Sequence, residues 1–294
     1  MDGYDLSGRS ALVTGASRGL GLSIAKALAA SGAEVFLSSQ SPEDLERAAK
    51  EVKKEALKPN QKIFHLATDI SKPQNVSKLI EAALEAFAGL TILVSNAGVY
   101  GTMGKIEDVA WGEFTKAIEI NLYGPILLAR ALAPHFRKQG YGKIIQLSGG
   151  GATNPLPRLE SYAASKAAVV RFMESLALDL AQFHVDVNSI APGLLDTRML
   201  DQILEAGPEA VGQAYHQRML EARGANKCVS LAVPTKLAIF LASKASDGIT
   251  GKLISAVWDD YEDWPNHIEQ LNKSDLYTLR RITGRDRNSG WGDK

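Results

Sequence analysis

The chain has 294 residues, of which 45% are hydrophobic and 22% charged, the composition of an ordinary globular protein. Its 33 basic residues balance 33 acidic ones, so the charge gives no support to a nucleic-acid partner. The single cysteine, Cys228, excludes an internal disulfide and indicates a reducing, cytoplasmic setting. The first residues lack the basic start and apolar run of a signal peptide. No apolar stretch approaches the ~20 residues needed to span a bilayer, so we expect no membrane partner.

Short apolar runs alternate with longer amphipathic segments along the chain, a pattern typical of βα units on a parallel sheet. Helices are predicted between these runs, for example over residues 22–30 and 42–57. Because the runs are almost continuously apolar, both faces of the sheet should be covered. The pattern predicts an α/β fold, a doubly wound, Rossmann-like, parallel sheet in a single domain. The seven predicted strands are residues 11–13, 35–37, 63–66, 92–94, 143–147, 185–187 and 253–257.

Two segments interrupt this rhythm. Residues 194–229 are long, rich in helix formers and carry Arg198, His216 and Arg218, which predicts a helical substrate lid. Residues 258–294 follow the last strand as a C-terminal extension, and the composition of the final ten predicts a mobile end. Residues 1–257 would then form the dinucleotide-binding catalytic domain, with the lid inside it.

A glycine-rich turn joins the first predicted strand to the first helix. Glycines let the backbone approach a pyrophosphate, and the start of the helix offers free N–H groups with a partial positive charge. The turn therefore predicts a phosphate cradle. It consists of Thr14, Gly15, Ala16, Ser17, Arg18, Gly19, Leu20 and Gly21.

The glycine spacing of this turn, Gly-x-x-x-Gly-x-Gly, resembles that of the short-chain dehydrogenase/reductase family. Further matches follow in the family's order, and together they cover residues 6–257. The matching positions are Thr14, Gly15, Gly19 and Gly21, then Asp69-Ile70, Asn96-Ala97-Gly98, Asn121, Ser148, Tyr162-x-x-x-Lys166 and Pro192-Gly193-x-x-x-Thr197.

The resemblance implies an oxidoreductase that binds a nicotinamide cofactor and interconverts a small carbonyl compound and an alcohol. It implies that Asp69 and Ile70 lie near the adenine, and that Pro192, Gly193, Leu195 and Thr197 hold the nicotinamide end. Asn121 would kink its helix and hold a water molecule that links Lys166 to solvent. A homodimer or homotetramer would form through helices at residues 109–137 and 161–183.

The segment after the second strand predicts which cofactor is used. An acidic residue there would bind the ribose diol of NAD(H), but the chain has Ser39 and Gln40 instead. Arg18 in the cradle could pair with a 2′-phosphate, and a guanidinium–phosphate pair is stronger than a neutral hydrogen bond. We therefore predict NADP(H) rather than NAD(H).

Tyr162 and Lys166 are four residues apart in an alanine-rich segment, so a helix would place both on one face. A free tyrosine has a pKa of about 10. A nearby ammonium and the positive ring of an oxidised nicotinamide would lower that pKa toward the working pH, where acid–base catalysis is efficient. Ser148 ends the fifth strand at the edge that carries ligands in open α/β sheets, where it could hold the reacting oxygen. The predicted catalytic residues are Asn121, Ser148, Tyr162 and Lys166.

The chain departs from the family pattern after the last strand. Many members continue into a Val-Asp-Gly-Gly turn, whereas this chain reads Val257-Trp258-Asp259-Asp260, which suggests a different edge to the substrate cleft. We interpret the nearby carboxylates as a solvated turn, and we predict no metal site. The polar lid keeps open a reaction on a sugar or nucleotide-linked sugar. A non-catalytic nucleotide-binding sensor or scaffold is the alternative from another class.

Overall fold

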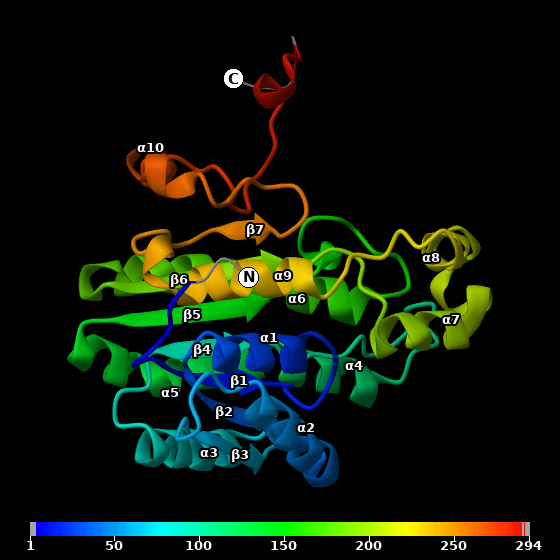
Figure 1. The fold of residues 1–294 in the computed structure, drawn as a ribbon. Helices are drawn as coiled ribbons and strands as arrows, with labels where there is room; N and C mark the ends of the chain where they lie inside the picture. Colours follow the sequence, from blue (N-terminus) through cyan, green and yellow to red (C-terminus); the bar gives the residue numbers. More distant parts are fainter. Residues whose placement is uncertain (1–3, 290, 292–294) are drawn as a thin grey trace.

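The computed structural model describes residues 4–289 and 291. Its centre is a seven-stranded sheet in the order β3-β2-β1-β4-β5-β6-β7, and every neighbouring pair is parallel (Figure 1). The predicted doubly wound α/β fold is confirmed. The strands are β1 (Ser10–Thr14), β2 (Glu34–Ser39), β3 (Ile63–Ala67), β4 (Ile92–Ser95), β5 (Gly142–Leu147), β6 (Val185–Ala191) and β7 (Leu253–Ser255).

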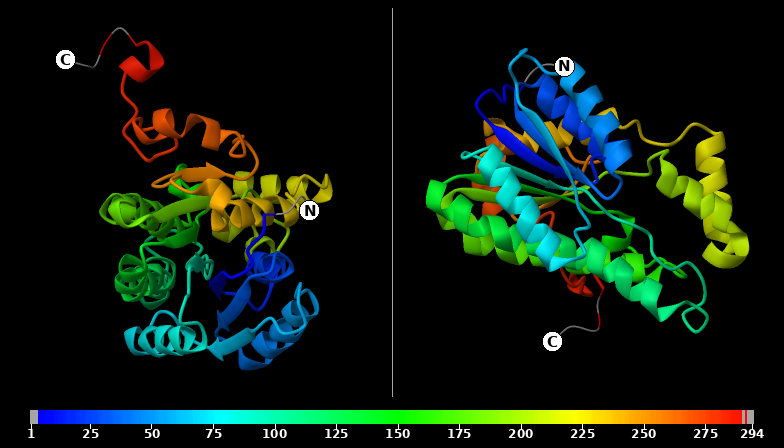
Figure 2. Two further views of the ribbon diagram at one scale, coloured as in Figure 1. Left: turned by 60° about the vertical axis from the view of Figure 1, so that its left-hand side comes forward. Right: turned by 90° about the horizontal axis from the view of Figure 1, so that it is seen from below.

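Helices cover both faces of the sheet, as Figure 2 shows in two further views. On one face, α1 (Gly19–Ala30), α2 (Pro42–Lys54) and α9 (Ala232–Ala242) bury their apolar sides in a first core. On the other face, α3 (Pro73–Ala86), α5 (Gly124–Gln139) and α6 (Glu160–Leu180) bury theirs in a second core. Within the described part of the chain, no helix is both long and apolar enough to cross a membrane.

Some boundaries differ from the sequence prediction. Helix α1 begins at Gly19 rather than residue 22, because the last glycines of the cradle already form its first turn. Strand β7 ends at Ser255, whose hydroxyl accepts hydrogen bonds from the backbone N–H groups of Val257 and Trp258. Strand β3 lies at the sheet edge and is only partly covered, so the expectation of a sheet buried on both faces holds for the inner strands alone.

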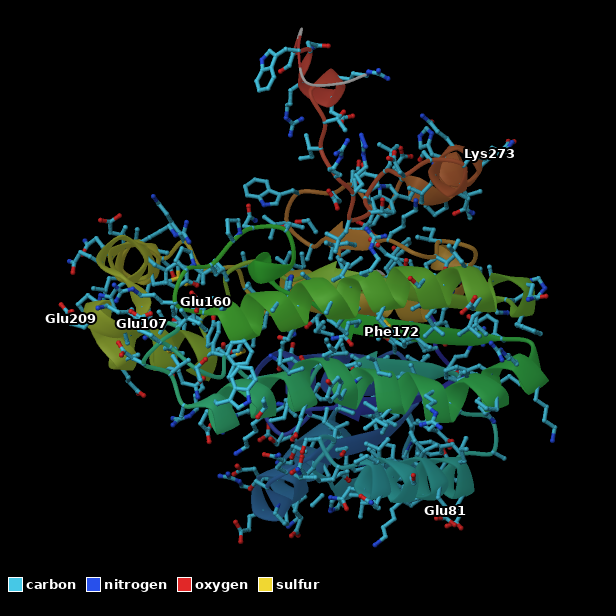
Figure 3. The ribbon with its side chains drawn as sticks, turned by 180° about the vertical axis from the view of Figure 1, so that it is seen from behind. Glu81, Glu107, Glu160, Phe172, Glu209 and Lys273 are labelled. Carbon is cyan, nitrogen blue, oxygen red and sulfur yellow. The ribbon has the colours of Figure 1, made fainter. Side chains whose placement is uncertain are left out.

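The predicted lid consists of α7 (Arg198–Val211) and α8 (Gln213–Gly224), which lie beyond the carboxyl ends of the strands (Figure 1). Its apolar side chains form a small third core together with Leu159 and residues of the loop after β4, separate from the two main cores. Arg223 ties its two ends together through carboxylates of Asp196, at 2.5 Å, and Asp201, at 2.7 Å. Figure 3 shows Glu209 of α7 and Glu160 at the start of α6 at this same end of the molecule. Arg158 joins the two elements by donating to the Glu209 carbonyl.

The C-terminal extension packs against the domain rather than standing apart from it. It contains η5 (Trp264–His267) and α10 (Ile268–Asn272), and Tyr261, Trp264 and Leu271 are buried in the first core. The buried Lys252 ammonium donates to carbonyls of Leu271, Ser274 and Leu276 at 2.8, 3.3 and 3.0 Å.

The prediction of a mobile end falls partly on residues 290 and 292–294, which lie outside the described residues. Before them, η6 (Arg285–Arg287) is a short helical turn, in which Asp286 accepts from Thr283 and Arg280. Whether this end is mobile stays a prediction.

Candidate active site

A continuous cleft of about 1610 Å³ runs along the carboxyl ends of the strands. This volume exceeds the roughly 300–1,000 Å³ of ordinary small-molecule pockets, so it has room for a dinucleotide and a second molecule. One half is bordered by the loops that follow β1, β2 and β4, and the other by the lid and the extension. Lys166, Tyr162 and Ser148 border it where the two halves meet.

The glycine turn after β1 forms a tight cradle in the first half. Gly15 has a φ of +62°, and a β-carbon there would lie 2.8 Å from the Ala97 α-carbon. A β-carbon on Gly21 would lie 2.3 Å from the Gly15 carbonyl oxygen. Asn96 Nδ2 fixes the turn by donating to the carbonyls of Thr14 and Gly15, both at 3.1 Å. Backbone N–H groups at the start of α1 therefore stay accessible to a phosphate, and the residues fit a dinucleotide.

The loop after β2 borders the cleft where we predict the ribose end of the cofactor. Ser39, Gln40 and Arg18 all border the cleft there. The Ser39 hydroxyl is buried and has no hydrogen-bond partner among the described residues, so it is available to a ligand. Asp44 also borders this region, and hydrogen bonds from Arg47 and Ser41 hold its pKa below the usual range. The site therefore combines one guanidinium with one carboxylate.

Asp69 does not border the cleft, although its neighbours Thr68 and Ile70 do. Its carboxylate accepts from the Ser71 backbone N–H at 2.9 Å and from the Gln40 side chain. It thus joins the loops after β2 and β3, and a contact with adenine remains a prediction. Thr68 is a residue that motif matching missed, since a lone threonine before an Asp-Ile pair has no distinguishing pattern.

Tyr162 and Lys166 lie on one face of α6, as their spacing predicts, and both are buried. Lys166 Nζ donates to the Leu147 carbonyl at the end of β5 at 2.8 Å. It lies 5.7 Å from the centre of the Tyr162 ring. The strand end thereby fixes the ammonium beside the phenol.

Burial determines the pKa values of this pair. It raises the pKa of the Tyr162 phenol, and the neighbouring Tyr215 raises it further. It lowers the pKa of Lys166 to about 8. The predicted lowering of the Tyr162 pKa depends on the positive ring of a bound nicotinamide and stays a prediction, while in the protein alone burial raises that pKa. Tyr162 is protonated at neutral pH and is ready to act as a proton donor.

Asn121 lies in a π-helical turn, η1 (Glu119–Tyr123), between α4 (Trp111–Ile118) and α5. This turn interrupts the helix as expected, and π-turns are frequent at functional sites. Its amide accepts from the Val99 N–H and donates to the Val99 carbonyl, both at 2.8 Å. It also donates to Ser165 Oγ at 3.0 Å. A β-carbon on Gly98 would lie 3.3 Å from Asn121 Oδ1 and 3.5 Å from Lys166 Nζ, so both polar groups flank this glycine.

Ser148 follows β5 and its backbone N–H donates to the Ile190 carbonyl at 2.8 Å. Its hydroxyl is shielded from solvent and has no partner among the described residues. The next residue faces the tyrosine instead, since a β-carbon on Gly149 would lie 2.2 Å from the Tyr162 hydroxyl. Ser148 borders the cleft, and its catalytic role stays a prediction.

Most of the predicted site residues border one cleft. The exceptions are Thr14, Gly21, Asp69 and Asn121, which contact residues that line the cleft. The nicotinamide-end residues Pro192, Gly193, Leu195 and Thr197 all border the cleft between the cradle and the lid. Trp258 and Asp259, from the segment expected to form a different cleft edge, also border it. Sequence matching missed several residues of the outer half, since they come from segments without motifs: Tyr100, Asn154, Tyr215 and Tyr277.

The lid brings two of its three polar candidates to the cleft. Arg198 and Arg218 border it, whereas His216 Nε2 pairs with the Leu204 carbonyl inside the lid at 3.2 Å. Cys228 packs against the apolar core of the lid, and burial raises the pKa of its thiol. That environment does not favour the reactive thiolate.

The acidic residues after β7 are held by separate partners. Asp259 accepts from the Ser255 N–H at 2.7 Å, Glu262 pairs with Lys236 at 2.6 Å, and Asp263 accepts from Asn266. Among the residues that the structure describes, no group of histidine, cysteine or acidic side chains is arranged to hold a metal ion.

Comparison with known proteins identifies the class that this cleft defines. The family of short chain dehydrogenases matches residues 9–207, more than half of the chain. The chain belongs to the short-chain dehydrogenase/reductase family, and it is an NAD(P)-dependent oxidoreductase that acts on alcohol or carbonyl substrates.

Individual relatives resemble nearly the whole chain. The rabbit dehydrogenase/reductase SDR family member 4 (Oryctolagus cuniculus) is 30% identical over 85% of this chain and 92% of its own length. A versicolorin reductase of Emericella nidulans is 33% identical over 86% of this chain and 96% of its own. Among solved structures, levodione reductase aligns with a TM-score of 0.77 at 25% identity, covering 85% of this chain and 96% of its own.

Replacing Gly149 with alanine should displace the Tyr162 hydroxyl, because the new β-carbon would overlap it. We expect kcat to fall by about 10²-fold or more, since misplacing a reacting group by ~1 Å has such an effect. Gly150→Ala is the matched control, because a β-carbon there meets no atom within 4 Å. Equal kcat for the two variants would contradict this placement of the tyrosine.

Burying the charged Lys166 ammonium destabilises the folded protein, so Lys166→Met should raise the free energy of unfolding of the cofactor-free protein at pH 7 by up to ~3 kcal/mol. The gain is reduced by the loss of the hydrogen bond to the Leu147 carbonyl. Because the pKa of Lys166 in the folded protein, about 8, is below its ordinary value of 10.5, the unfolded chain binds more protons between these two pH values. The free energy of unfolding of the wild type therefore rises with pH across that window. The difference in stability between Lys166→Met and the wild type becomes smaller. Urea unfolding from pH 7 to 10.5 measures it, with the exposed Lys138→Met as control. A pH-independent difference would contradict this assignment.

Proposed function

We propose that this protein is an NADP(H)-dependent oxidoreductase that interconverts a ketone and a secondary alcohol. The observation that carries the proposal is the buried pair of Tyr162 and Lys166, at the junction of the glycine-cradle half and the outer half of one cleft. Asn121, Ser148, Tyr162 and Lys166 are all present, which favours turnover over the alternative of a non-catalytic nucleotide sensor or scaffold.

In this mechanism, Tyr162 donates its proton to the carbonyl oxygen during reduction and takes it back during oxidation. The raised pKa keeps the phenol protonated at neutral pH, which suits the reductive direction. Lys166, held by the Leu147 carbonyl, stabilises the phenolate that remains after the transfer. Asn121 and Lys166 flank Gly98, where a proton could be returned from solvent.

The nicotinamide ring, when bound, supplies or accepts the hydride. Gly15, Ser17, Gly19 and Leu20 would hold the pyrophosphate at the start of α1. Lys166 would orient the nicotinamide ribose, and residues 192–197 would cover the nicotinamide end. Lys166 would therefore serve both the cofactor and the proton transfer.

The preference for NADP(H) rests on charge and hydrogen bonding after β2. Ser39, Gln40 and Arg18 border the cleft where no acidic residue follows the strand. The exposed Arg18 can reach a 2′-phosphate, and the unpartnered Ser39 hydroxyl can donate to it. The Asp44 carboxylate would repel a 2′-phosphate, so the attraction between Arg18 and that phosphate has to exceed this repulsion.

A second candidate is a reductase or dehydrogenase that acts on a sugar or a nucleotide-linked sugar. The outer half of the cleft favours it, because aromatic rings of Trp258 and Tyr277 alternate there with the polar groups of Asn154, Arg218 and Asp259. Such rings pack against the apolar faces of sugars while polar groups bind the hydroxyls. A screen with NADPH and cyclohexanone, acetoacetyl-coenzyme A or fructose separates a simple ketone, an acyl thioester and a keto-sugar.

We also propose a cytoplasmic homodimer or homotetramer. The helices expected at the interface carry exposed apolar side chains, Trp111 at the start of α4 and Leu178 near the end of α6, which are 69% and 82% exposed. Contact with a second copy would cover them. The single cysteine fits a reducing compartment.

Replacing Tyr162 with phenylalanine should keep cofactor binding and lower kcat by about 10²–10⁴-fold, the usual effect of losing a general acid. NADPH fluorescence measures binding, and NADPH oxidation with the best carbonyl compound of the screen measures turnover. Turnover retained in Tyr162→Phe would refute the catalytic assignment, and a wild type inactive with every class of carbonyl would favour the sensor.

Replacing Arg18 with alanine should weaken NADPH binding about tenfold or more and leave NADH binding nearly unchanged, since only NADPH carries the 2′-phosphate. Fluorescence titration of both cofactors measures this. Arg130→Ala is the control, because this exposed arginine of α5 does not border the cleft. An equal loss for both cofactors in Arg18→Ala would count against NADP(H) specificity.

A further inference from the structure

The C-terminal extension contributes side chains to the outer half of the cleft. It follows the last strand of the sheet and lies beside β7 (Figure 1). Two of its aromatic residues, Trp258 and Tyr277, border the cleft, and both keep exposed surface, 86% and 40%. The extension is therefore a wall of the same cleft that Tyr162 borders.

The backbone of Tyr277 is held in an uncommon conformation. Its φ is +60°, in the left-handed region that residues other than glycine rarely adopt, so the surrounding structure has to maintain it. The Leu253 N–H donates to the Tyr277 carbonyl at 2.8 Å. Because Leu253 begins the edge strand β7, this bond ties Tyr277 directly to the sheet.

The chain is fastened on both sides of this residue. Before it, the buried Lys252 ammonium donates to the Leu276 carbonyl at 3.0 Å. After it, the Leu279 N–H donates to the buried Glu174 carboxylate of α6 at 2.7 Å. Arg171 of α6 donates to the Leu279 carbonyl and pairs with Glu174 at 2.7 Å. Tyr277 is thus positioned between β7 and α6.

The ring of Tyr277 has a rigid support. It lies 4.3 Å from the ring of Trp264, at an angle of 34°, and Trp264 is itself buried in the first core. A ring that is packed against a buried ring loses little further freedom when a ligand binds to it. Tyr277 therefore offers an aromatic surface that is ordered before the substrate arrives.

The polar groups of this wall are already engaged. The Ser255 hydroxyl accepts from the N–H groups of Val257 and Trp258 at 3.3 and 3.2 Å. The Asp259 carboxylate accepts from the Ser255 N–H at 2.7 Å. These bonds stabilise the turn after β7, whereas the rings of Trp258 and Tyr277 keep exposed surface. The wall therefore favours an apolar ring over a polyhydroxylated one.

We propose that Tyr277 is a specificity-determining residue, whose ring packs against an apolar ring of the substrate remote from the reacting carbonyl. Arg171 is the positioning residue that holds Tyr277 through Leu279. The inference rests on the proposed function and names its substrate class, a cyclic ketone that carries a second apolar ring. A contact remote from the reacting atoms is alike in the ground state and the transition state, so it acts on KM rather than on kcat.

The test compares cyclohexanone with 2-tetralone, using the full-length protein and NADPH. Both are six-membered cyclic ketones, but only 2-tetralone carries a fused benzene ring. We expect the wild type to have a kcat/KM at least about tenfold higher for 2-tetralone. Tyr277→Ala should raise KM for 2-tetralone about tenfold, while its KM for cyclohexanone and its kcat for both ketones stay within twofold.

Further variants separate the ring from its support. Tyr277→Phe keeps the ring and should keep the wild-type KM. Arg171→Ala changes an exposed side chain, so it tests the same contact without disturbing the interior. It should raise KM for 2-tetralone by a smaller factor, and the double variant with Tyr277→Ala should match Tyr277→Ala. Leu276→Ala is the matched control, because this neighbour in the same segment is 48% exposed and does not border the cleft.

A wild type without a preference for 2-tetralone overturns the inference. An unchanged KM in Tyr277→Ala, an equal rise for both ketones, or the same rise in Leu276→Ala overturns it as well. Factors that multiply in the double variant overturn the role of Arg171. A protein that reduces no carbonyl compound, or one that keeps its turnover in Tyr162→Phe, refutes the proposed function itself. Turnover lost in Tyr162→Phe, with an unchanged KM in Tyr277→Ala, refutes only the role of the extension.

Discussion

The side chain of Asn96 joins the loops that follow β1 and β4, and the site depends on this junction. Its Nδ2 donates to the carbonyls of Thr14 and Gly15, where the strand order reverses direction. Helices leave these two strands toward opposite faces of the sheet, so a crevice opens between them. Gly15 and Gly21 let the two loops meet without side chains between them. The cradle, the start of α1 and the floor of the cleft follow from this contact.

The proposed catalytic groups are buried, and their burial lowers the stability of the folded protein. Lys166 has its pKa lowered by desolvation, and the Ser148 and Ser39 hydroxyls lack partners among the described residues. Groups of this kind are unfavourable for stability and useful for binding, because a ligand that satisfies them regains the lost hydrogen bonds. The same burial keeps Tyr162 protonated until a ligand changes its surroundings.

The substrate half of the cleft is built from parts that are remote in sequence. Tyr100, Tyr215 and Tyr277 come from the loop after β4, the lid and the extension, and they border one space. The Lys252 ammonium holds the extension in place by donating to the carbonyls of Leu271 in α10 and of Leu276 after it. Tyr277, the next residue, borders the cleft. We therefore expect the lid and the C-terminal segment, rather than the sheet, to determine substrate specificity.

Sequence alone determined the elements whose signals are local. The apolar runs predicted all seven strands, and the glycine turn and the Tyr162–Lys166 spacing predicted residues that do border the cleft, because periodicity and turn chemistry act over a few residues. Only the tertiary structure decided that Gly149 faces the tyrosine, that the Ser148 hydroxyl is shielded and that Tyr215 enters the site. These features depend on contacts between segments more than 50 residues apart, as between Tyr162 and Tyr215. Desolvation, which raises the Tyr162 pKa in the protein alone, likewise depends on everything packed around a group and not on its neighbours in sequence.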